Sequence, residues 1–115
     1  MNLARHIIDA VARYWSEDVQ IFGVWDDGPA TVCVVYRRII DPTMILGCRL
    51  HFHAEAADGT IEGFARDVAI NLAEPIGTLI DHVRRDEHGI VWVAIPENRP
   101  TPQPPASVLR TLESM

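Results

Sequence analysis

Two histidines stand two residues apart, in a spacing that can present imidazoles to a metal ion. His51 and His53 lie in the alternating stretch 44–55, so both side chains project from one face of a predicted strand. Imidazole nitrogens are common zinc ligands, and a third ligand would come from Glu55 or a neighbouring strand. The alternative is two partly exposed histidines on the polar face of a sheet. We predict no cofactor and retain His51 and His53 as weak metal candidates.

Other groups that could do chemistry stand in settings that do not favour it. Cys33 and Cys48 lie within apolar stretches, where cysteine behaves as a small buried apolar residue. A nucleophilic cysteine needs a nearby base and an electropositive setting. Paired carboxylates at 17–18, 26–27 and 86–87 fall at predicted turns or element ends, where carboxylates are solvated. The seven glycines are scattered and form no phosphate-binding loop. The sequence therefore predicts no enzyme.

Two tryptophans stand beside acidic residues. Tryptophan is favoured in binding hot spots, and carboxylates suit a basic partner. The alternative is that both tryptophans are core residues with one solvent-exposed edge. Trp92 lies inside an apolar stretch and is expected in the core. The predicted partner-binding residues are Trp15, Glu17, Asp18, Trp25, Asp26 and Asp27.

The charge balance bears on the kind of partner. The net charge of −6 disfavours nucleic acid, whose phosphates are met by lysine and arginine, and favours a basic protein. The alternative is that the charge only keeps the protein soluble. No apolar run approaches the roughly 18 residues that cross a membrane. We expect a cytoplasmic protein with reduced thiols, either a monomer or a homodimer.

Hydrophobic periodicity predicts the elements of the first half. Residues 3–16 carry an apolar stripe at helical spacing. Three stretches rich in β-branched and aromatic residues follow, and they are separated by Asp-Gly-Pro and Asp-Pro-Thr turns. The expected meander has strands at 19–26, 30–40 and 44–55, with turns at 27–29 and 41–43.

In the second half, Thr60 is a predicted cap for a helix that runs to about Leu72. Pro75 breaks the run. A second helical piece is expected to follow, with Ile76, Leu79, Ile80 and Val83 on one side and a stop at Gly89. Residues 90–95 are predicted as a strand buried on both faces.

The C-terminal segment differs in composition from the rest, because five of the eight prolines lie between Pro96 and Pro105. We expect an extended tail over 96–115, outside a domain of residues 1–95, with a possible short helix over 107–113. Arg99, Pro102 and Pro105 fit the spacing of an SH3-type ligand, but a solvated linker has the same composition.

The order α-β-β-β-α-α-β predicts an α+β fold. We expect a four-stranded, mainly antiparallel sheet, with helices largely on one face and a proline-rich C-terminal tail.

The stretch from Thr60 to Val93, with its Glu-Pro-x-Gly break and its Trp-containing strand, resembles the C-terminal part of small hypothetical proteins from actinobacteria. Compact acidic α+β chains of this kind resemble immunity proteins of polymorphic or contact-dependent toxin systems. The resemblance implies an inhibitor that binds and blocks a basic toxin domain, and it carries over no functional residue. A secretion chaperone or adaptor that dimerises and exposes an apolar groove is the alternative, and a small metal-binding protein or enzyme using His51 and His53 is another.

Overall fold

The computed structural model describes residues 3–15, 17–52, 60–73, 83–93 and 99–114. It confirms the α+β class, with three helices and five strands in the described part. The elements are α1 (Leu3–Tyr14), β1 (Val19–Asp26), β2 (Thr31–Arg38), β3 (Asp41–His51), α2 (Ile61–Ala73), β4 (Val83–Arg85), β5 (Val91–Val93) and α3 (Ala106–Glu113). None of these helices is long and apolar enough to cross a membrane.

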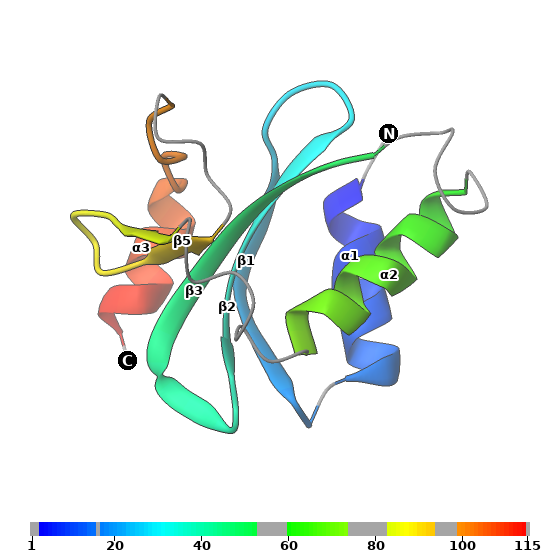
Figure 1. Cartoon of the computed structure of the whole chain (residues 1–115), viewed down its shortest axis with the longest axis horizontal. Helices are drawn as coiled ribbons and strands as arrows, with labels where there is room; N and C mark the ends of the chain where they lie inside the picture. Colours follow the sequence, from blue (N-terminus) through cyan, green and yellow to red (C-terminus); the bar gives the residue numbers. More distant parts are fainter. Residues whose placement is uncertain (1–2, 16, 53–59, 74–82, 94–98, 115) are drawn as a thin grey trace.

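The sheet is mixed, with strand order β1-β2-β3-β5-β4 (Figure 1). The meander β1-β2-β3 is antiparallel as predicted, and β1 has the expected bounds. The last long-range pairing differs, because β5 runs parallel to β3, with Leu46 opposite Val91 and Gly47 opposite Trp92. The described sheet therefore has five strands and not the four predicted, and it is mainly antiparallel as expected, with this one parallel pair.

The strand that the sequence did not predict is β4, which pairs antiparallel with β5. Val83 continues the helical spacing of Ile76, Leu79 and Ile80, so periodicity placed it in a helix. In the structure Val83–Arg85 is extended, because it forms the outer arm of a hairpin whose turn is held by Asp86. The rest of the predicted second helix lies outside the described residues.

One face of the sheet is covered by α1 and α2, which lie together on the right in Figure 1. Leu3, Ile7 and Val11 form the buried stripe of α1, as the periodicity predicts. They pack with inward residues of the central strands, among them Val32, Val34 and Leu46. The N-terminus of α2 is capped as expected, since the Gly63 N–H donates to Thr60 Oγ1 at 2.9 Å. These contacts make the larger core.

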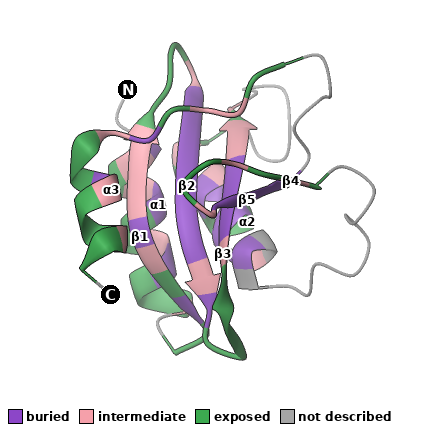
Figure 2. Cartoon of the chain, turned by 90° about the vertical axis from the view of Figure 1, so that its left-hand side faces the viewer, coloured by how far each residue is buried: buried purple, intermediate pink, exposed green. Residues whose placement is uncertain are grey.

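The opposite face carries a second, smaller core under α3 (Figure 1). Its buried members are Phe22, Val35, Ile90, Trp92 and Val108. Figure 2 shows β2 buried along most of its length between the two layers. The expectation that helices lie largely on one face holds for α1 and α2, but α3 covers the other face.

The C-terminal helix was predicted, but its docking was not. Gly23 lies at a bulge in β1, and a Cβ there would collide with Val108. The missing side chain at Gly23 lets α3 approach the sheet closely. Thus residues 106–113 are not a solvated extension of residues 1–95, although they lie within the predicted tail.

The turn between β2 and β3 also differs from the prediction. It is formed by Ile39 and Ile40, whereas Asp41–Thr43 belong to β3. The Ile39 N–H donates to the Asp18 carbonyl at 3.0 Å, so it pairs with the α1–β1 connection and not with β3. The predicted turn at 27–29 is confirmed, with Gly28 at φ +117°.

Candidate partner-binding site

The six predicted partner-binding residues do not form one surface. Trp15, Glu17 and Asp18 precede β1, whereas Trp25, Asp26 and Asp27 end it, and an eight-residue strand is about 26 Å long. The tryptophans also lie in different layers. Trp15 is half-buried against the larger core, and Trp25 is half-buried against the smaller core. Each tryptophan is thus a core residue with an exposed edge.

At the Trp25 end, the carboxylate of Asp27 is already paired within the protein. Arg49 Nε lies 2.9 Å from Asp27 Oδ2, and the thiol of Cys33 donates to the same oxygen at 3.7 Å. Trp25 is fixed by an edge-on contact with Trp92, whose ring centroid lies 6.3 Å away at 85°. Asp27 therefore offers a partner much less charge than its sequence position suggests.

The same network holds His51. Thr31 Oγ1 donates to the Pro29 carbonyl at 3.1 Å, so it accepts from His51 Nδ1 at 2.9 Å. This assigns the Nδ1–H tautomer, and the lone pair on Nε2 then faces Arg49 Nη1 at 3.4 Å. Both imidazole nitrogens are engaged, and a guanidinium stands next to the nitrogen that a metal would need.

This geometry does not favour the metal hypothesis. Among the residues that the structure describes, no three His, Cys, Asp or Glu side chains gather closely enough to hold an ion. His53 and Glu55 lie outside the described residues. The Arg49 guanidinium also stands 3.4 Å from His51 Nε2, where a metal ion bound to that nitrogen would have to lie.

The two cysteines are buried free thiols. Burial raises the pKa of Cys33 to about 12, and the negative charge of Asp27 acts in the same direction. Burial alone raises the pKa of Cys48 to about 12. Because the thiolate is the nucleophile, neither thiol is activated in the folded chain.

At the other end of β1, the Asp18 carbonyl accepts from the Ile39 N–H of the exposed β2–β3 turn, and this turn lies at the bottom of Figure 1. Ile40 is 89% exposed and Ile39 is 47% exposed. We call Glu17, Asp18, Ile39 and Ile40 the tip surface. The backbone bond from Ile39 to Asp18 fixes the turn against the α1–β1 connection. The sequence contained a signal for this surface, since two isoleucines directly precede an Asp-Pro pair, but they were interpreted as strand.

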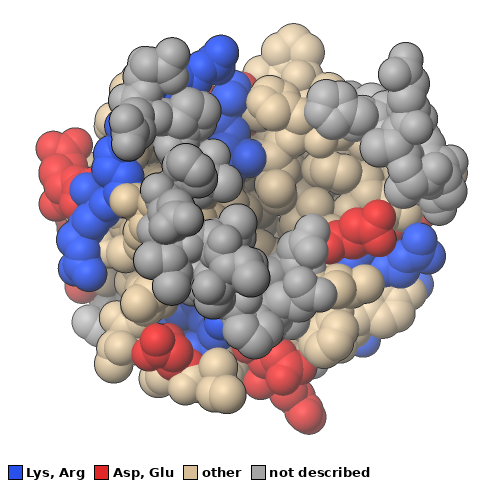
Figure 3. All heavy atoms as spheres, in the orientation of Figure 1, with Lys and Arg blue, Asp and Glu red and all other residues tan. Residues whose placement is uncertain are grey.

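The carboxylates of the tip surface differ from Asp27 in having no ion pair with a described residue. Both Glu17 and Asp18 are exposed, and no described arginine or histidine lies within ion-pair distance of either. On the face drawn in Figure 3, acidic and basic side chains alternate around the rim. Unpaired carboxylates next to exposed isoleucines therefore distinguish the tip from a surface of mixed charge.

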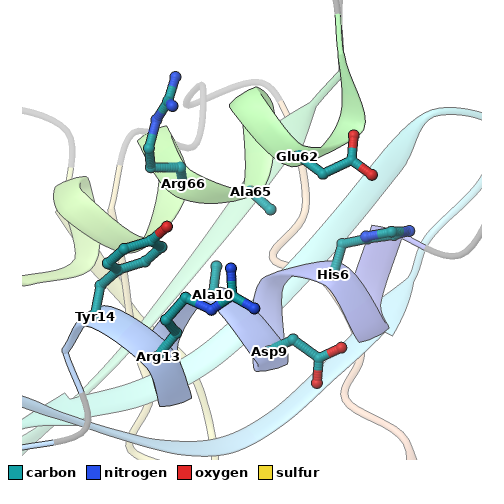
Figure 4. Close-up of a pocket in the computed structure, with 8 residues that line it drawn as sticks. All are labelled: His6, Asp9, Ala10, Arg13, Tyr14, Glu62, Ala65 and Arg66. Carbon is teal, nitrogen blue, oxygen red and sulfur yellow. The ribbon is translucent and has the colours of Figure 1, made fainter.

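A separate cavity of about 190 Å³ lies between α1 and α2 (Figure 4). Ala10 and Ala65 lie between the helices, Tyr14 reaches from α1 toward α2, and Arg66 points away from α1. Its charges balance, because Asp9 and Glu62 stand with Arg13 and Arg66. Asp9 also pairs with Arg5 at 3.3 Å. This lining selects neither an anion nor a cation.

The possible SH3 ligand is tied into the fold. The Arg99 carbonyl accepts from Arg84 Nη1, Pro104 is buried, and Pro105 is the N-cap of α3. An SH3-type groove needs a free polyproline segment, so these contacts disfavour that use.

No protein-family model matches the chain, and neither a curated protein nor a solved structure matches it significantly.

Proposed function

We propose that this protein is a binding module that acts as an immunity-like inhibitor, blocking a basic toxin domain in the cytoplasm through its tip surface. The observation that carries the proposal is the backbone bond from Ile39 to Asp18, which holds the turn with the exposed Ile39 and Ile40 against the connection that contains Glu17 and Asp18. The net charge of −6 supports a basic partner.

The tip surface has the two parts that such binding needs. Burying an isoleucine side chain contributes about 1.5–3 kcal/mol, so Ile40 is a suitable anchor for an apolar pocket on the partner. Glu17 and Asp18 supply negative charge at its rim, where charges mainly raise the association rate. A basic active site is shaped to receive phosphates, and carboxylates can occupy it without being cleaved.

The proposal changes the predicted set of partner-binding residues. Glu17 and Asp18 are retained, and Ile39 and Ile40 are added. Asp27 is removed because its charge is used by Arg49. Trp15 supports the tip from behind, since its carbonyl accepts from the Asp18 N–H at 3.0 Å and from the Val19 N–H at 3.1 Å.

The test uses the C-terminal domain of a large secreted toxin encoded beside this gene. Association and dissociation rates are measured for the wild type, Ile40→Ser and the double variant Glu17→Gln/Asp18→Asn. We expect Ile40→Ser to raise the dissociation rate about tenfold or more, and the double variant to slow association and flatten its salt dependence.

Ile8→Ser is the matched control, because Ile8 is an exposed isoleucine of α1, away from the tip. Its rates should equal those of the wild type. The absence of any toxin gene in the neighbourhood, or unchanged rates in both tip variants, would contradict the proposal.

A secretion chaperone or adaptor is the second candidate, and one observation favours it. β1 is an eight-residue strand at the edge of the sheet, and no described strand lies beside its outer edge. An extended client segment or a second copy could pair there. Light scattering after size exclusion separates the candidates, since a chaperone of this kind should be a dimer, whereas a strict monomer supports the inhibitor.

A further inference from the structure

A cavity of about 560 Å³ opens beside the C-terminal end of α2, on the face of the sheet that carries the larger core. Its walls are mostly apolar side chains of β3, β4 and β5, namely Met44, Leu46, Val83, Val91 and Val93. Both its size and its lining are typical of sites that bind small molecules. Apolar walls do not indicate which ligand binds, but a charged group in this cavity indicates the charge of the ligand.

That group is the guanidinium of Arg38, which lines the cavity although the residue is only 8% exposed. Its Nε donates to the Leu72 carbonyl at 3.3 Å, in the last turn of α2. No described carboxylate lies within ion-pair distance of it. No described side-chain nitrogen is both fully buried and without a partner, so the Nη atoms still contact accessible space. Because Arg38 is one of the residues that line the cavity, we infer that its Nη atoms face it.

A buried arginine with no described carboxylate within ion-pair distance is an unusual arrangement. A buried charge is costly unless it is paired, and the Leu72 carbonyl together with the negative end of α2 compensates only part of it. A guanidinium has five N–H donors, of which one is used here. The remaining donors match a carboxylate or a phosphate, which they bind in pairs.

The other charged groups of the cavity fit the same ligand. Arg85 is exposed on β4 and adds a second guanidinium to the lining. Asp41 is the acidic member, and one of its oxygens already accepts from Thr43 Oγ1 at 3.0 Å. Two arginines against one aspartate leave the lining with a net positive charge, in a protein whose total charge is −6. The local field thus favours an anion where the overall charge does not.

We propose that this cavity binds a small amphiphile, with a carboxylate or phosphate head on Arg38 and an apolar body along Met44, Val83 and Val93. This proposal does not rest on partner binding at the tip surface, because its evidence is the cavity and the buried Arg38, although Arg38 directly precedes Ile39 in the chain. A failure of one proposal therefore leaves the other standing.

The test is calorimetric titration of the full chain with four twelve-carbon probes below their micellar concentrations. Dodecanoate and dodecyl phosphate carry anionic heads, dodecanol is uncharged, and dodecyltrimethylammonium is cationic. We expect at least one anionic probe to bind with one-to-one stoichiometry, about tenfold or more tighter than dodecanol and the cation. The preferred anion then distinguishes a carboxylate ligand from a phosphate ligand.

Arg38→Gln should weaken anionic binding about tenfold or more. Arg37→Gln is the matched control, because Arg37 is the neighbouring arginine but its Nε pairs with Gln20 Oε1 at 2.7 Å and it does not line the cavity. If Arg38→Gln unfolds the chain because the bond to the Leu72 carbonyl is lost, Val83→Glu provides a second test. Val83 is an exposed residue of the cavity wall, and a carboxylate there should also weaken the binding of anionic probes. Equal affinity for all four probes, no binding at all, or binding that resists both variants would overturn the proposal.

Discussion

The indole N–H of Trp92 donates to Asp86 Oδ2 at 2.9 Å, across the hairpin that joins β4 to β5. The other carboxylate oxygen, Oδ1, accepts from the backbone N–H groups of His88 and Ile90, each at 2.9 Å. One carboxylate therefore shapes the turn and also satisfies the polar atom of a fully buried tryptophan. In the sequence Asp86 forms a carboxylate pair with Glu87, and its contacts in the fold are structural.

The first prediction concerns this carboxylate. Asp86→Ala should lower the free energy of unfolding by about 2–3 kcal/mol, because it leaves the buried Trp92 N–H without an acceptor and removes two turn hydrogen bonds. Urea denaturation followed by tryptophan fluorescence measures it. Glu87→Ala is the control, since Glu87 is exposed and makes only a surface contact with His88. Equal stabilities of the two variants would contradict this role for Asp86.

A second prediction concerns Gly47, which lies under the indole of Trp92. A Cβ at Gly47 would lie 2.6 Å from Trp92 Cε3. Gly47→Ala should therefore destabilise the fold by about 1–3 kcal/mol through overpacking. The double variant with Trp92→Leu should cost less than the sum of the single changes. Additive losses in urea denaturation would show that the two residues do not compete for space.

The third prediction concerns the docking of α3. Val108→Asp places a charge in the smaller core and should cost at least about 2 kcal/mol. Removal of residues 106–115 should expose Phe22 and Trp92 and lower the melting temperature. Ser107→Asp is the control, because Ser107 lies on the exposed side of the same helix. If the truncated chain and the full chain had the same melting temperature, α3 would add nothing to stability.

A fourth prediction follows from the raised pKa values of Cys33 and Cys48. The ordinary pKa of 9.0 applies to the unfolded chain, whereas the folded thiols hold their protons to about 12. Between these values the unfolded chain binds fewer protons, so stability is complete below pH 9 and falls as pH rises toward 12. Burial also raises the pKa of Tyr36, which acts in the same direction at higher pH.

The thiol contribution is isolated between about pH 8 and pH 10, before tyrosine ionisation dominates. Urea denaturation should show stability falling in this range for the wild type and a flatter profile for Cys33→Ala/Cys48→Ala. Identical profiles would show that the thiols do not cause the loss. Both thiols should also resist an aromatic disulfide reagent until the chain unfolds.

Several elements were predictable because their signals are local. The stripe of Leu3, Ile7 and Val11 predicts the first helix, and Thr60 predicts where α2 begins. Val19–Asp26 is recognisable from its β-branched and aromatic content. For the site, the sequence identified Glu17 and Asp18 as acidic neighbours of a tryptophan. It did not show that Ile39 and Ile40 stand beside them.

Other features depend on contacts between distant residues, and for these local patterns were insufficient. Val83 fits a helical stripe as well as an edge strand, and only its pairing with Val93 decides between them. Asp26 and Asp27 look equivalent in sequence, but Arg49, on another strand, neutralises one of them.

By itself, the sequence determined an acidic α+β chain with an amphipathic first helix, an antiparallel meander and a C-terminal helix, because periodicity, caps and turn residues act over a few positions. Only the tertiary structure decided that β5 enters the sheet parallel to β3 and that α3 covers the second face. It also decided that Arg38 lines a mostly apolar cavity with no described carboxylate within ion-pair distance. These relationships join residues far apart in the chain, and they arise from packing and hydrogen bonding that form only when the sheet assembles.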